Sequence, residues 1–147
     1  MRFTILAILF ITAFPLLLLA TQPVNKSTWK GIAIKGYDCV SYHIESKAVK
    51  GKKDFSAKHL GATWLFSSKV NRDKFINSPQ TYLPQYNGFC AWAMANGYKA
   101  KIDPESFAVI EKKLYLNYNK DIQSKWEEDQ TRLISLANLE WKKLTSE

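Results

Sequence analysis

The chain has 147 residues, of which 46% are hydrophobic, 14% aromatic and 23% charged. A chain of this length can bury one hydrophobic core, and its composition excludes collagen, low-complexity disorder and cysteine-framework miniproteins. Its two cysteines cannot supply a four-cysteine zinc site, and its two histidines cannot complete a three-histidine site, so any metal site must be mixed or incomplete. The net charge is +8, but the lysines are scattered, so we expect a solvated surface and no nucleic-acid partner.

The first 20 residues have the pattern of a secretory signal peptide. A positive residue is followed by an apolar run from Phe3 to Ala20 and then by a polar segment. We expect cleavage after Ala20, a periplasmic or secreted protein, and no stable membrane insertion after signal removal. Retention of the run as an anchor is the alternative. We expect residues 21–30 to be a linker and residues 31–144 to form one domain with C-terminal helices.

Turn signals predict the elements of the first half. The turn at 36–38 leads into a short strand or a helical turn, with His43 near the end of an early strand. Residues 55–66 are expected to form a β-hairpin that turns at or near Leu60-Gly61. Ser67-Ser68 can cap a helix that runs to about residue 77, and Pro79 opens a further short turn of helix.

The second half contains a helix, a hairpin and an amphipathic C-terminal segment. Residues 89–95 are small and apolar, and Asn96-Gly97 gives this helix a stop signal. Residues 107–118 are expected to form the second hairpin. Apolar residues then recur at helical spacing over 121–144, in one long helix or in two that are broken near Asp129. The sequence shows no internal repeat, and the expected fold class is α+β, with small antiparallel hairpins packed with several helices.

Cys90 and Met94 are the sharpest local feature of the sequence. On a helix, residues four apart face the same way, which would place a thiol beside a thioether. Soft sulfur ligands suit Cu(I), and an imidazole from His43 or His59 could complete a three-coordinate site. Two other interpretations stay open, because cysteine and methionine are ordinary core residues. Cys90 could also form a disulfide with Cys39, the only pairing that the chain allows.

The sequence supports catalysis less than it supports these three interpretations of Cys90. Cys90 and either histidine could form a Cys-His hydrolase, but no oxyanion-hole motif accompanies them. The acidic residues form no paired-carboxylate motif, and no phosphate-binding glycine motif is present. We therefore expect no enzyme.

Several ordered blocks resemble an exported YHS-domain protein. The match runs from about Gly31 to Trp141, and the blocks that carry it are Gly36-Tyr37-Asp38, Val40-Ser41-Tyr42, 61–68, 71–75, 84–91 and 114–119. The resemblance implies a short α+β module similar to treble-clef metal-binding folds, followed by a C-terminal helical extension. It also implies association with a metal, copper first. Cys90 matches the family's cysteine position, whereas Cys39 stands where exported members often have proline.

Three hypotheses for function follow. The leading one is a non-enzymatic protein that binds or buffers a soft transition metal, copper first, through Cys90 with Met94 and a histidine. The alternative is a metal-free module with a structural Cys90, which binds a small molecule or a protein through the aromatic residues Tyr86, Phe89 and Trp92. The third is a thiol-dependent enzyme.

Overall fold

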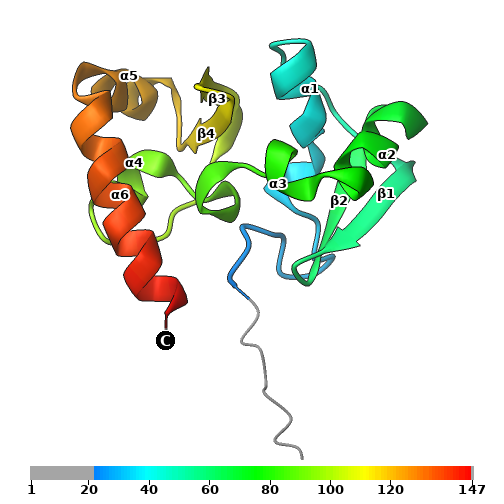
Figure 1. Ribbon diagram of the computed structural model, residues 1–147, viewed down its shortest axis with the longest axis horizontal. Coiled ribbons are helices and arrows are strands. Elements are labelled where there is room, and N and C mark those ends of the chain that lie inside the picture. The colour runs from blue at the N-terminus through cyan, green and yellow to red at the C-terminus, as the bar shows by residue number, and fades with distance from the viewer. Residues whose placement is uncertain (1–21, 147) are drawn as a thin grey trace, which may run out of the picture.

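The computed structural model describes residues 22–146 and has a mixed α+β fold (Figure 1). The expected signal peptide lies outside the described residues. Two antiparallel hairpins, each a separate two-stranded sheet, are combined with short helices, which confirms the predicted class. The elements, in chain order, are α1 (Cys39–Ile44), β1 (Lys52–His59), β2 (Ala62–Phe66), α2 (Lys69–Asn77), α3 (Pro79–Tyr82), α4 (Ala91–Ala95), β3 (Asp103–Ile110), β4 (Lys113–Asn117), α5 (Lys120–Glu128) and α6 (Gln130–Thr145).

The first α-helix, α1, comes before the first strand. Asp38 caps α1 by accepting hydrogen bonds from the N–H groups of Val40 at 2.8 Å and Ser41 at 3.3 Å. The helical alternative for this segment is therefore confirmed. His43 lies in the last turn of α1, so its predicted place near the end of a strand is wrong.

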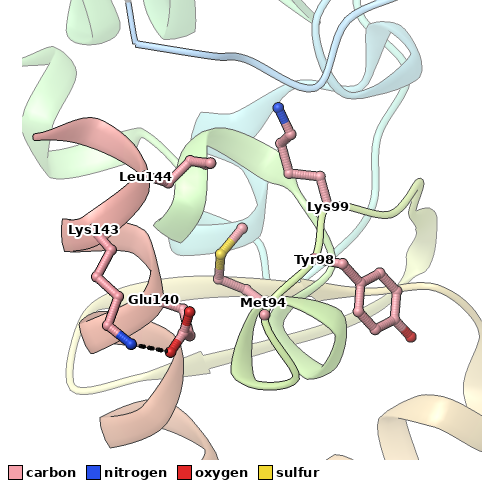
Figure 2. A pocket seen from close by; sticks show the side chains of 7 residues that line it. Met94, Tyr98, Lys99, Glu140, Lys143 and Leu144 are labelled. Carbon is pink, nitrogen blue, oxygen red and sulfur yellow. Dashed lines mark hydrogen bonds and ion pairs between the residues drawn. The ribbon is translucent and has the colours of Figure 1, made fainter. Parts of the chain in front are cut away.

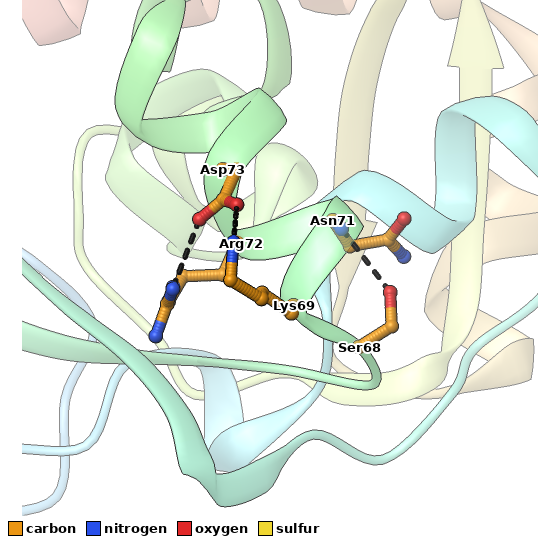
Figure 3. Close-up of polar contacts among 5 residues, drawn as sticks. All are labelled: Ser68, Lys69, Asn71, Arg72 and Asp73. Carbon is orange, nitrogen blue, oxygen red and sulfur yellow. Dashed lines mark hydrogen bonds and ion pairs between the residues drawn. The ribbon is translucent and has the colours of Figure 1, made fainter.

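The first hairpin, β1–β2, and helix α2 follow as expected. Leu60 and Gly61 at the hairpin turn have φ of 50° and 70°, as a tight two-residue turn between twisted strands requires. Ser68 then caps α2, because its hydroxyl accepts a hydrogen bond from the N–H of Asn71 at 3.1 Å (Figure 3). These local signals were readable from the sequence.

The second half has the same order of hairpin and helix. β3 and β4 turn at Glu111 and Lys112, whose φ values are 49° and 62°. Asn119 caps α5 by accepting a hydrogen bond from the N–H of Ile122 at 2.8 Å. The helical run ends at Asp129, where φ is −140°, and α6 begins at the next residue. The alternative of two helices broken near Asp129 is confirmed.

The buried core of the described residues has two parts. One joins the two halves of the chain, and its largest members are Trp64, Tyr42, Phe66, Phe75, Ile34, Ile102, Leu114 and Leu116; Cys90 belongs to it. The other lies against α6 and contains Tyr86, Ala91, Met94, Tyr115, Trp126, Leu133 and Ala137. The two parts meet at the short helix α4, because Cys90 precedes that helix and Met94 lies within it.

The ion pairs of residues 22–146 lie at the surface. On α2, Asp73 accepts hydrogen bonds from Lys69 at 2.6 Å and from Arg72 at 3.0 Å, and these contacts lower its pKa (Figure 3). Exposed ion pairs of this kind contribute little to stability.

The segment that precedes the hairpins, expected as a linker, contacts the domain. Val24 is buried, and Asn25 donates its backbone N–H to the carbonyl oxygen of Asn87 at 3.1 Å and its side-chain amide to that of Gly88 at 2.8 Å. Among residues 22–146, no helix has the length and apolar character needed to cross a membrane.

Candidate functional site

Cys90 is the N-terminal cap of α4, and one extended residue, Phe89, separates it from a strained turn. Tyr86, Asn87 and Gly88 have successive positive φ values of 56°, 48° and 86°, and this conformation directs the chain into the helix. The N–H of Cys90 donates to the carbonyl oxygen of Ala100 at 3.2 Å, which holds the residue against the loop that follows α4. Its position is therefore fixed from both sides.

A small cavity of about 200 Å³ opens beside Cys90. Its walls come from α4, the loop after it, and the start of α5. The lining residues are Cys90, Trp92, Ala93, Tyr98, Ala100, Tyr118 and Ile122. Apart from the thiol, the indole N–H of Trp92 and the two phenol hydroxyls, the lining side chains present only hydrocarbon, so the cavity suits an uncharged and largely apolar occupant.

The Cys90 thiol has one polar side-chain partner, Asn117. Cys90 Sγ donates to Asn117 Oδ1 over 3.6 Å, and the same oxygen accepts the N–H of Trp92 at 3.1 Å. Asn117 Nδ2 is buried and has no hydrogen-bond partner among the described residues. The amide therefore orients the thiol through its oxygen alone.

Burial keeps the Cys90 thiol in its neutral form. Desolvation raises the pKa of Cys90, and the nearby backbone N–H groups of Ala93, Tyr118 and Trp92 offset only part of that effect. The reactive or metal-binding form of cysteine is the thiolate. At neutral pH the group is thus a polarisable apolar wall of the cavity.

Met94 faces a different cavity from Cys90. A hollow of about 360 Å³ is lined by Met94, Gly97, Tyr98, Lys99, Glu140, Lys143 and Leu144. Figure 2 shows the Met94 side chain between its own helix and α6, near the ion pair in which Lys143 Nζ lies 2.7 Å from Glu140 Oε1. The two sulfur-bearing side chains, expected on one face, line separate cavities and belong to separate parts of the core.

The two histidines lie in the first half of the chain. The ring of His43, on α1, makes an edge contact with Tyr82, with centroids 5.6 Å apart. The ring of His59, at the end of β1, makes a similar contact with Phe75 at 5.5 Å. Burial lowers the pKa of both histidines, and the Nε2 atom of each is buried with no hydrogen-bond partner among residues 22–146. Figure 1 places α1 and β1 in the half opposite α4.

These positions give a direct test of the expected donor set for copper. Within the described part of the chain, no three side chains of His, Cys, Asp and Glu come together as a metal-binding group. Met94 and Cys90 line different cavities, and the histidines pack on other aromatic rings. The residues present do not fit a three-ligand site for Cu(I).

Both cysteines are free thiols, and both are buried. Burial, with the nearby charge of Asp38, raises the pKa of Cys39 well above its usual value. No disulfide joins Cys39 to Cys90 in this structure.

The three aromatic residues of the alternative hypothesis occupy different environments. Tyr86 is buried, and its hydroxyl donates to Asn138 Oδ1 at 3.0 Å. Phe89 is half-buried, with Lys99 Nζ 5.8 Å from its ring centre. Trp92 alone of the three lines the Cys90 cavity.

One polar cluster was missed in the sequence. The carboxylate of Asp38 is fully buried, and beyond its two contacts in α1 it accepts the N–H and the hydroxyl of Ser67, both at 2.8 Å, and Asn71 Nδ2 at 2.7 Å. An aspartate directly before a short apolar segment is a helix-cap signal that could have found it. Tyr118 and Ile122 were also missed, because only tertiary packing brings them to Cys90.

Comparisons with protein-family models, with curated proteins and with solved structures found no match to this chain.

Proposed function

We propose that this chain is an exported, non-enzymatic domain that binds a small apolar molecule in the cavity beside Cys90. The observation that carries the proposal is the cavity itself, about 200 Å³ in volume and lined by Trp92, Tyr98, Tyr118 and Ile122. An apolar cavity of about 150 Å³ is large enough to hold benzene. A monocyclic aromatic or a short branched hydrocarbon therefore matches this site in size and polarity.

Recognition at this site depends on shape and apolar contact. Aromatic rings favour edge or offset contacts with another ring, and the indole and phenol groups provide such surfaces. The neutral thiol of Cys90 adds a polarisable contact without a charge. A ligand of six or seven heavy atoms can gain on the order of 0.3 to 1.5 kcal/mol per atom. The total is then about 2 to 10 kcal/mol, and the middle of that range corresponds to dissociation constants between about 1 μM and 1 mM, which we expect for this site.

The wider identity of the chain is part of the same proposal. The sequence blocks that resemble exported YHS-domain proteins, together with the α+β fold of two small hairpins, support assignment to a YHS-type module. The apolar run at residues 3–20 supports export to the periplasm or the medium. Mass spectrometry of the protein expressed from the full reading frame tests export, because cleavage after Ala20 removes a defined mass.

Copper binding at Cys90 stays a second prediction. The observation that favours it is a free thiol in the wall of a cavity. The lack of converging donors among the described residues is the reason that the apolar ligand comes first.

Thermal unfolding of the reduced protein separates these functions. We expect toluene to raise the melting temperature in a concentration-dependent way, because it binds only the folded state. We expect Cys90→Ser to keep a toluene response and to lose any response to Cu(I). A stoichiometric Cu(I) response in the wild type, without any response to toluene, would replace our proposal by the metal hypothesis.

A further inference from the structure

The two halves of the chain follow one plan. β1 and β3 have eight residues, β2 and β4 have five, and α2 and α5 have nine. β3, β4 and α5 each begin 51 positions after β1, β2 and α2, as 103 − 52 = 51 shows for the first pair, and α4 begins 52 positions after α1, since 91 − 39 = 52. Both hairpins have a register shift at the same place, after the first pair of the ladder. Figure 1 shows the two hairpin-and-helix groups on opposite sides of the molecule.

The correspondence extends to the turn and helix before each hairpin. Residues 34–36 have φ values of 39°, 56° and 81°, and residues 86–88 have 56°, 48° and 86°. An extended residue follows each turn, and the helix cap comes next: Asp38 before α1 and Cys90 before α4. The N–H of Asp38 donates to the carbonyl oxygen of Val49 at 2.8 Å, just as that of Cys90 donates to Ala100 at 3.2 Å.

Counterpart aromatic side chains also pack in the same way in the two halves. In the first half Trp64, on β2, lies against Phe75, on α2, with ring centres 5.6 Å apart. In the second half Tyr115, on β4, lies against Trp126, on α5, at 5.3 Å. The helix after each of these pairs then packs on the helix at the start of the same half, α3 on α1 and α6 on α4.

We infer that residues 34–77 and 86–128 are two copies of one structural unit, and that the Cys90 cavity is the second copy's version of the Asp38 site. Few counterpart residues are alike, so the sequence, which shows no internal repeat, did not reveal it. The copies differ most at this site. Tyr118 and Ile122 occupy the positions of Ser67 and Asn71, the residues whose side chains bind the Asp38 carboxylate.

This difference assigns separate roles to the two copies. In the first copy a buried carboxylate and its polar partners lock the cap of α1 to the start of α2. In the second copy a thiol replaces the carboxylate, a phenol ring and an aliphatic side chain replace the hydroxyl and the amide that bind it, and a cavity lies beside the thiol. Tyr118 and Ile122 are then the residues that determine specificity for an apolar ligand. This last step rests on the proposed function, whereas the relation between the copies does not.

The copy relation predicts that a buried carboxylate will be accepted at position 90. Burial of an unpaired charge strongly destabilises a folded protein. At position 90, however, the N–H groups of Trp92, Ala93 and Tyr118 lie near the side chain, as those of their counterparts do around Asp38. We expect Cys90→Asp to fold at pH 7, with a melting temperature lowered by less than about 10 °C.

Cys39→Asp is the matched control, because Cys39 is equally buried but lies one position past the cap of its helix. We expect this variant to be unfolded at 25 °C. Equal destabilisation by Cys39→Asp and Cys90→Asp would overturn the inference.

A second substitution should change the melting temperature in opposite directions in the wild type and in Cys90→Asp. Ile122→Asn places an amide where Asn71 stands in the first copy. In the wild type it should lower the melting temperature, since the amide would find an apolar site. In Cys90→Asp it should raise the melting temperature, because the amide can donate to the new carboxylate. A decrease in both backgrounds, or a double variant that does not fold, would overturn the inference.

Toluene binding separates this inference from the proposed function. If the copies are related and the cavity binds toluene, then adding Tyr118→Ser to Cys90→Asp and Ile122→Asn should preserve the fold and remove the toluene response. If the wild type does not respond to toluene but the sign reversal at Ile122 occurs, the copy relation holds and the proposed function fails. A folded triple variant with an unchanged toluene response would refute the assignment of specificity to Tyr118 and Ile122.

Discussion

Filling the Cys90 cavity should strengthen the fold and block the ligand. Ala100 lines the cavity, and its carbonyl oxygen is fixed by the N–H of Cys90 at 3.2 Å, so its side chain has a defined direction. Ala100→Leu adds three carbon atoms. At about 0.8 kcal/mol for each buried methylene the gain is about 2.4 kcal/mol. Ordering the leucine side chain costs about 0.5 to 1 kcal/mol. We therefore expect a net increase of about 1.5 kcal/mol in the free energy of unfolding.

The same variant should weaken toluene binding at least tenfold, which corresponds to about 1.4 kcal/mol. Urea denaturation gives the stability, and NMR titration gives the affinity. Ala48→Leu is the control: Ala48 is also a half-buried alanine, it packs against the core in the first copy, and it does not line the cavity. It should leave the affinity unchanged. Destabilisation of Ala100→Leu by more than about 1 kcal/mol, with unchanged toluene affinity, would refute the claim that usable space lies beside Cys90.

Three further predictions concern buried polar and titratable groups. Asp38→Ala should cost about 3 to 5 kcal/mol of unfolding free energy in urea at pH 7, because several buried N–H, hydroxyl and amide donors lose their acceptor. A loss below about 1 kcal/mol would contradict the network. Burial raises the pKa of Cys90 and of Cys39, so iodoacetamide should label the folded protein slowly at pH 7 and faster as the pH rises. Labelling at the rate of a free cysteine would count against burial of the thiols. Burial lowers the pKa of His43 and His59, so the unfolded chain takes up protons at a higher pH than the folded one. The stability that they contribute is present above about pH 6.5 and is lost as pH falls through their folded pKa values. Urea denaturation between pH 7.5 and 5 should show this loss of stability, and the double variant His43→Gln/His59→Gln should lose less. If the double variant and the wild type have the same dependence of stability on pH, the loss does not come from these two histidines.

Local signals in the sequence predicted much of the fold. Leu60-Gly61 specified a hairpin turn and Ser68 specified a helix cap, because each of these acts within a few residues of chain. The choice between one C-terminal helix and two broken near Asp129 stayed open until the structure showed the break. The nature of the first element was left open. Its outcome depends on the carboxylate of Asp38, which is held by partners about 30 positions away.

The candidate site was predictable only in part. Cys90 stood out because it is one of two cysteines and lies in a distinctive block. Its separation from Met94 could not be foreseen, since α4 has only five residues and lies between two cavities. Tyr118 and Ile122 reach the site from the second hairpin and α5, so no local pattern connects them with Cys90.

Intermolecular NOEs between bound toluene and the protein test the central claim most directly. The account predicts contacts from the toluene ring to the Ile122 methyl groups and the Trp92 ring in the reduced wild-type protein, since both line the cavity beside Cys90. These contacts should weaken in Ala100→Leu and persist in Ala48→Leu. NOEs confined to Met94 and Leu144, in the cavity against α6, or no binding at millimolar toluene, would contradict it.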